Sequence, residues 1–98
     1  MVDVETVLAL TVEHYGVEVS EYCGFRSGAG GRDLAAYLCR RHTSVTLREL
    51  SGWFGFSHPD GAAGLVKRVK AKLAKSRQLQ ADVNAIERKL RRKTEDQV

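Results

Sequence analysis

Three amphipathic segments in close succession, between Arg32 and Lys70, constrain the fold of this chain most strongly. The first two are short: residues 33–40 and 46–54 each carry apolar side chains at helical spacing. A turn that contains Gly55 leads into a third segment, which is apolar on one side and basic on the other. This order predicts a helix-turn-helix, an arrangement that places its second helix in the major groove of DNA.

Capping residues set the expected bounds of these three helices. The first should extend from Arg32 to about His42. Thr46 followed by Glu49 forms a capping-box pattern that should begin the second helix, which Gly55 should end. Pro59 suits the first turn of a longer helix that continues to about Lys75, and this would be the helix that reads DNA.

The N-terminal part predicts one more helix and a short turn. Apolar residues recur at helical spacing from Val4 to Tyr15, with Asp3 as the N-terminal cap and Gly16 as the left-handed end. The connection that follows should hold one helical turn, capped by Ser20 and with Tyr22 in the core.

A final helix is expected near the C-terminus, where apolar residues recur at intervals of four, three and four positions: Leu79, Val83, Ile86 and Leu90. This stripe can fold back on the domain or pair with a second copy, and folding back is the favoured interpretation. Residues 94–98 should be frayed. No strand pattern of useful length occurs, so residues 1–93 are predicted to form a single small all-α domain of five or six helices.

The charges are divided along the chain. Residues 1–25 hold five acids and neither Lys nor Arg, whereas residues 61–93 hold eleven bases against Asp82 and Glu87. Such asymmetry points to a polyanionic partner, because clustered bases attract phosphates and release their counterions. A solvated helical surface without a partner is the alternative.

The helix-turn-helix geometry assigns expected roles to individual residues. The N-terminal end of the third helix should lie nearest the base edges, with Ser57, His58 and Asp60 as candidates. Asp60 can accept a hydrogen bond from cytosine or cap the helix, and capping is favoured. Phosphate contacts are expected from residues of the Gly-rich loop, of the second helix and of the basic face: Arg26, Arg32, Thr46, Arg48, Lys67, Arg68 and Lys70.

The run GRDLAAYLCRRHTSVTLRELSGWFG at residues 31–55 resembles the C-terminal DNA-binding domain, domain IV, of the bacterial replication initiator DnaA. A near relative of that domain is appended to some REP-associated tyrosine transposases, and the basic helix followed by residues 79–90 is similar to that version. The resemblance covers most of the chain and implies a Trp-repressor-like helical fold. It also implies a phosphate contact at Arg32, backbone contacts near Thr46 and Arg48, and base reading just after Gly55.

The chain departs from the initiator pattern where bases would be read. Initiators carry an Arg-Asp-His-Thr-Thr motif, and the matching positions here, residues 57–61, are Ser-His-Pro-Asp-Gly. The loop that is Arg-rich in initiators is Gly-rich at residues 24–31. We therefore expect binding to double-stranded DNA with altered base recognition. The alternative is a protein-interaction module that has lost recognition of the initiator's DNA box.

Other functions have weaker support in the sequence. The Gly-rich loop lacks the preceding strand and the Gly-Lys-Ser/Thr of a nucleotide-binding loop. His14, His42 and His58 lie far apart without ligands at metal spacing, and no nucleophile–base pair occurs, so neither a metal, another cofactor nor an enzyme activity is expected. Trp53 and Phe54 are predicted to be core residues.

The remaining expectations concern the cellular setting. Cys23 and Cys39 should pack as small apolar groups in a reducing compartment. No signal peptide or membrane span is predicted, so the expected location is the cytoplasm, at the nucleoid. The partners would be double-stranded DNA and a larger enzyme domain in cis or trans, with the chain itself a monomer or weak dimer.

Overall fold

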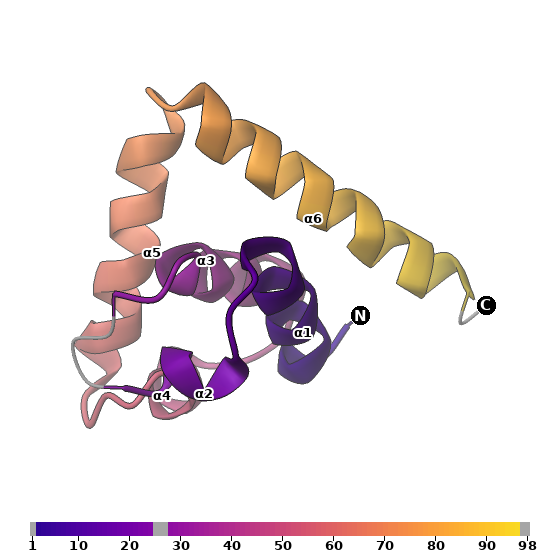
Figure 1. The fold of residues 1–98 in the computed structure, drawn as a ribbon. Helices are drawn as coiled ribbons and strands as arrows, with labels where there is room; N and C mark the ends of the chain where they lie inside the picture. The colour runs from indigo at the N-terminus through magenta and orange to yellow at the C-terminus, as the bar shows by residue number, and fades with distance from the viewer. Residues whose placement is uncertain (1, 25–27, 97–98) are drawn as a thin grey trace.

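A computed structural model of the chain describes residues 2–24 and 28–96, which form an all-helical domain (Figure 1). Its helices, in chain order, are α1 (Val4–Tyr15), α2 (Val19–Tyr22), α3 (Arg32–His42), α4 (Leu47–Trp53), α5 (Pro59–Leu73) and α6 (Arg77–Asp96). Helix α3 is central and packs against both α1 and α5, while α4 packs across α5. None of the described helices is long and apolar enough to cross a membrane.

The predicted N-terminal helix is confirmed at both ends. Asp3 accepts a hydrogen bond from the Thr6 N–H at 2.8 Å, and Gly16 adopts the left-handed conformation at φ 69°. The predicted cap of the next turn is wrong: Glu18 rather than Ser20 occupies the N-cap position, because α2 begins one residue earlier than Ser20. Tyr22 is fully buried, as predicted.

The helix-turn-helix consists of α4, the connection through residues 54–58, and α5. Thr46 caps α4 by accepting a hydrogen bond from the Glu49 N–H at 3.1 Å. The Glu49 carboxylate accepts from the Thr46 hydroxyl at 3.0 Å, whereas the predicted capping box would have it accept from the backbone N–H. Gly55 turns the chain at φ 78°, and a Cβ at this position would lie 2.0 Å from the Cys23 carbonyl oxygen, so only glycine fits.

Helix α6 folds back over α1, as predicted. Helices α5 and α6 meet at a sharp corner, from which α6 extends across the domain (Figure 1). Ser76 begins α6 by accepting a hydrogen bond from the Leu79 N–H at 3.1 Å. The helical backbone continues to Asp96, residues 97 and 98 lie outside the described part, and fraying from Thr94 stays a prediction.

The core gathers apolar side chains from all six described helices. Leu34 and Leu38 of α3 are completely buried, as are Leu50 of α4, Val69 of α5 and Ile86 of α6. Phe54 is also buried, which confirms that it is a core residue. Trp53 is half-buried and packs against the core. Cys39 is buried as predicted, and burial raises the pKa of its thiol to about 12. The prediction is wrong for Cys23, which is exposed because α2 is a single turn at the surface.

Candidate nucleic-acid interface

The first turn of α5 is exposed and is capped by His58. The Nδ1 atom of His58 accepts a hydrogen bond from the Asp60 N–H at 3.2 Å. The favoured prediction that Asp60 caps this helix is therefore wrong, because Asp60 lies inside the first turn and the extended backbone of His58 brings its ring over the free N–H groups. The Asp60 side chain is 90% exposed, at the helix end where the dipole favours an acid.

Ser51 fixes the start of α5 against α4. Its buried hydroxyl donates to the Pro59 carbonyl at 3.3 Å and accepts from the Ala62 N–H at 3.1 Å. The second of these bonds gives a partner to a backbone N–H at the start of a helix, where N–H groups can lack one within the helix. Sequence reasoning missed Ser51, because a serine on an amphipathic helix carries no sign of its partner until both helices are packed.

Arg32 lies beneath the interface with its guanidinium inside the protein. Its Nε donates to the Tyr22 carbonyl at 2.9 Å and its Nη2 to the Phe54 carbonyl at 2.6 Å. Its guanidinium carbon is 4.8 Å from the centroid of the Phe56 ring. Only 6% of the residue is exposed, and burial lowers the pKa of Arg32 from its usual value. These contacts give Arg32 a structural role between α2, α3 and α4, whereas its phosphate contact stays a prediction.

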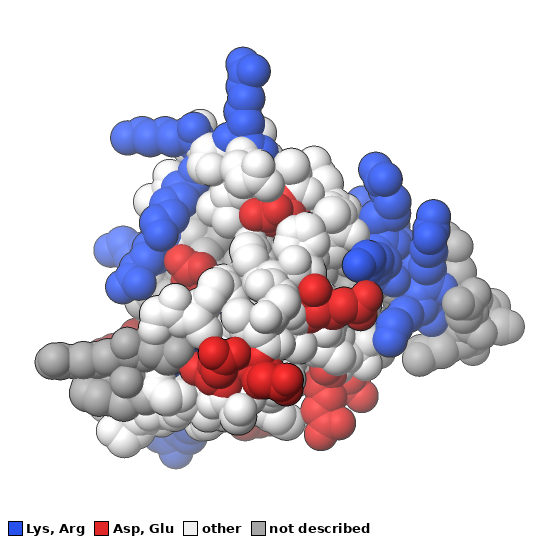
Figure 2. All heavy atoms as spheres, in the orientation of Figure 1, with Lys and Arg blue, Asp and Glu red and all other residues white. Residues whose placement is uncertain are grey.

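The predicted basic face of α5 is exposed. Lys67, Arg68 and Lys70 make no ion pair within the described residues, whereas Lys72 lies 3.6 Å from Asp33. Figure 2 shows a group of Lys and Arg side chains on the α5 side of the molecule, with a few acidic side chains beside it and most of the others lower on the same face. Helix α5 thus presents bases that are not neutralised by neighbouring carboxylates.

A groove between α3 and α5 adds two bases that sequence reasoning did not assign to DNA. It encloses about 360 Å³ and is lined by Tyr37, Arg40, Arg41, Val66 and Lys70. Arg40 Nη1 donates to the Val45 carbonyl at 2.7 Å, and Arg41 Nη1 donates to the Tyr37 hydroxyl at 2.8 Å. The sequence places both arginines near the negative end of a helix dipole, and only the packing of α3 on α5 brings them beside Lys70.

A second hollow, of about 460 Å³, lies at the exposed start of α5 and holds Arg48, Ser57 and His58 together. All three are exposed. Thr46 is exposed at the first end of α4, where its hydroxyl is engaged in the cap. Arg26, the remaining predicted contact, lies outside the described residues. Arg48 of α4 therefore lies beside Ser57 and His58 at the N-terminal end of α5.

Comparison with known proteins gives a weak but consistent relationship. No family model matches the chain. Over 60 residues, 58% of the chain, it is 35% identical to the chromosomal replication initiator protein DnaA of Tropheryma whipplei. Over 92 residues, 91% of the chain, it is 28% identical to the same protein of Mycobacteroides abscessus. These alignments cover 13% and 18% of the two relatives, respectively. The similarity supports a relationship to the C-terminal region of these initiators.

Proposed function

We propose that this chain binds double-stranded DNA through its helix-turn-helix, with α5 in the major groove. One observation carries the proposal: α5 begins with a capped, exposed turn, and farther along it carries Lys67, Arg68 and Lys70, which make no ion pair in the described part of the chain. In a helix-turn-helix the start of the second helix approaches the base edges. Ser57 and His58 are therefore the candidates for base contacts, and Asp60 beside them limits how closely a phosphate can approach.

Phosphate contacts would flank the reading helix on two sides. Thr46 and Arg48 lie at the start of α4, the element that rests on the backbone in this class of fold. On the other side, Lys67 and Arg68 project from α5, and Lys70 shares its groove with two arginines of α3. Such contacts fix position and orientation without reading sequence.

The biological role that we propose is DNA targeting within an initiator-like or transposase-related protein. The similarity to initiators supports a role within an initiator-like protein. The chain corresponds to a small fraction of the initiators' length, as expected for one domain of a larger protein. The Ser-His-Pro-Asp-Gly sequence at residues 57–61 supports a target other than the initiator's DNA box. The working location would be the bacterial cytoplasm, at the nucleoid, with the domain acting as a monomer or weak dimer.

The test separates base reading from phosphate contact. We expect Lys67→Gln to weaken binding to all duplexes alike, whereas Ser57→Ala and His58→Gln should change which sequences a selection from random duplexes recovers. A matched control is Lys75→Gln, beyond the last residue of α5. If Lys67→Gln and Lys75→Gln bound duplexes equally well, α5 would not be the docking helix.

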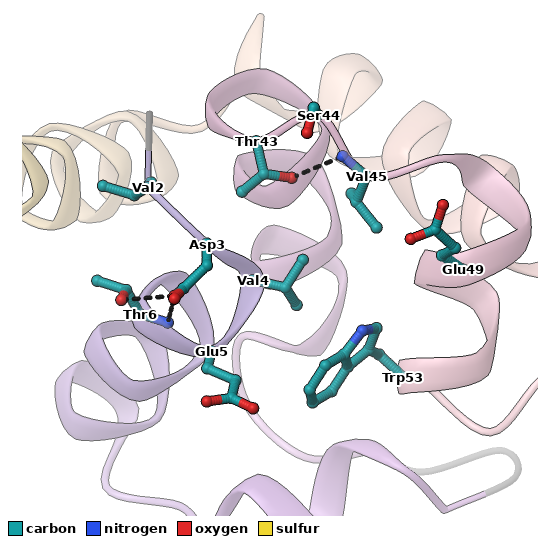
Figure 3. A pocket seen from close by; sticks show the side chains of 10 residues that line it. All are labelled: Val2, Asp3, Val4, Glu5, Thr6, Thr43, Ser44, Val45, Glu49 and Trp53. Atoms are coloured by element: carbon teal, nitrogen blue, oxygen red, sulfur yellow. Dashed lines mark hydrogen bonds between the residues drawn. The ribbon is translucent and has the colours of Figure 1, made fainter.

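A second candidate function, protein binding, is favoured by one feature on another part of the molecule. A hollow of about 650 Å³ lies between the start of α1 and α4 (Figure 3). Asp3, Glu5 and Glu49 line it together with the half-buried Trp53, and none of its lining residues is basic. This chemistry suits a basic protein segment, since carboxylates and an aromatic ring both attract cations.

Protein binding would be tested by substituting Glu5→Gln with Glu49→Gln. The double variant should keep duplex binding and lose a co-purifying protein, if one binds at this hollow. If this variant bound duplexes more weakly, the hollow between α1 and α4 would contribute to DNA binding, and docking through α5 would be contradicted.

A further inference from the structure

Two acids of α6, Asp82 and Glu87, lie among its basic residues, and both face the interior. Asp82 accepts hydrogen bonds from His14 Nε2 and from the Tyr15 hydroxyl, each at 2.9 Å. Glu87 lies 2.5 Å from His42 Nε2 and 3.3 Å from Arg41 Nε. These carboxylates anchor α6 to α1 and α3 and are therefore unavailable to neutralise the outer side of the helix.

The outer side of α6 carries three exposed arginines. Arg88, Arg91 and Arg92 are exposed and make no ion pair with residues 2–24 or 28–93, where side chains are described; we call these three the α6 basic face. Lys89, between them in sequence, pairs with Glu13 at 3.8 Å. Spacings of three and four residues place the three arginines on one side of the helix, within about one turn, or about 6 Å along its axis.

The α6 basic face is separate from the bases of α5. Helix α6 leaves the end of α5 at a sharp corner, and its C-terminal half lies on the far side of α1 (Figure 1). In Figure 2 one group of Lys and Arg side chains lies at the upper left of the view and another at the right, with acidic side chains between them. A duplex lying along the α5 face would leave this second group exposed.

We propose that the α6 basic face binds the phosphate backbone of a second nucleic-acid duplex, so that one domain bridges two DNA segments. The inference rests on the proposed function for the first duplex. Guanidinium groups form paired hydrogen bonds with phosphate oxygens, and three of them in one turn favour a polyanion over a single charge. Release of the counterions from the second duplex would drive its binding.

The experiment measures bridging directly. One duplex is fixed to beads, a fluorescent duplex is added with the full chain, and the retained fluorescence is recorded. The test variant is Arg88→Gln with Arg91→Gln and Arg92→Gln, and the matched control is Lys67→Gln with Arg68→Gln and Lys70→Gln. Because the α6 arginines are exposed, the test variant should melt at the wild-type temperature.

The proposal expects the α6 variant to retain at least about fivefold less fluorescent duplex, while its affinity for one dilute duplex falls less than about twofold. The α5 variant should lose affinity for the single duplex. Equal retention by the wild type and the α6 variant would overturn the proposal. If the α5 variant kept full affinity while the α6 variant lost retention, the α5 docking face would be wrong and the α6 site would stand.

Bridging through protein pairs is distinguished by sedimentation without DNA. The proposal expects the wild type and the α6 variant to sediment as the same species. A wild-type dimer that the α6 substitutions convert to a monomer would show that this face binds a second copy, and would overturn the proposal.

Discussion

The aromatic ring of Phe56 restricts which residues can occupy the start of α5. The ring is half-buried, with the Arg32 guanidinium over it and Gly61 against it. A Cβ built on Gly61 would lie 2.2 Å from Cγ of this ring, closer than packed atoms approach. Gly64, one turn later, has open space at the same position. Gly61 therefore has no room for a side chain, whereas Gly64 of the same helix does.

This contrast predicts opposite effects of the same substitution. Gly61→Ala should destabilise the protein by about 1–3 kcal/mol, because the ring must move and disturb Arg32. Gly64→Ala should stabilise it by about 0.5–1 kcal/mol, because alanine favours a helix interior and meets no neighbour. Urea unfolding of the two variants measures both changes. Equal effects would mean that the Phe56 contact does not constrain this turn.

Arg32 is predicted to contribute to the stability of the fold, whether or not it also contacts DNA. Arg32→Met removes a buried cation that satisfies two carbonyls, and the loss should be about 2–4 kcal/mol in the free energy of unfolding. Arg48→Met, at an exposed position, should change stability by less than about 0.5 kcal/mol and serves as the control. Similar unfolding curves for the two variants would contradict the structural role.

At the scale of the element, helix ends were predictable from sequence and helix partners were not. Asp3, Thr46 and Pro59 mark helix starts through chemistry that acts within four residues, so α1, α4 and α5 begin where their sequences indicate. His58 as a cap was missed because histidine is a rare cap and Asp60 offered a commoner one. The contacts of Ser51 and Arg32 join segments that packing alone brings together.

The anchoring of α6 predicts a specific pH dependence. Burial alone would raise the pKa of Asp82, but hydrogen bonds from His14, Tyr15 and Gln78 together hold it below the usual 3.8. A carboxyl whose pKa is lowered by folding stabilises the native state above its unfolded pKa. This stabilisation is lost as the pH falls through the lower, folded value. The free energy of unfolding should therefore decrease below about pH 4, where carboxyls of the unfolded chain begin to take up protons.

Asp82→Asn tests this dependence. At pH 6 the variant should be less stable than the wild type by about 1–3 kcal/mol, because hydrogen bonds to a charged group are lost. At pH 3 the difference should shrink, since the wild-type carboxyl is then becoming protonated. Urea unfolding at the two pH values measures the change. A difference that stayed constant would assign the pH dependence to other carboxyls.

At the scale of the whole molecule, charged side chains are separated both along the sequence and by whether they face the interior or the solvent. The sequence shows an acidic first quarter and a basic last third. The fold turns Asp82 and Glu87 inward, leaves the α5 bases outward, and gathers acids at the hollow beside Trp53. Composition could predict a polyanionic partner, but the separation into two basic groups depends on the angle between α5 and α6, which no local pattern encodes.

The salt dependence of duplex binding tests the central claim most directly. Binding of a labelled duplex should weaken steeply between about 50 and 200 mM salt, because each phosphate contact releases a counterion. The variant with Lys67→Gln, Arg68→Gln and Lys70→Gln should show a slope of log affinity against log salt that is shallower by about 1 for each phosphate contact removed. An unchanged slope, or wild-type binding insensitive to salt, would contradict DNA docking through α5.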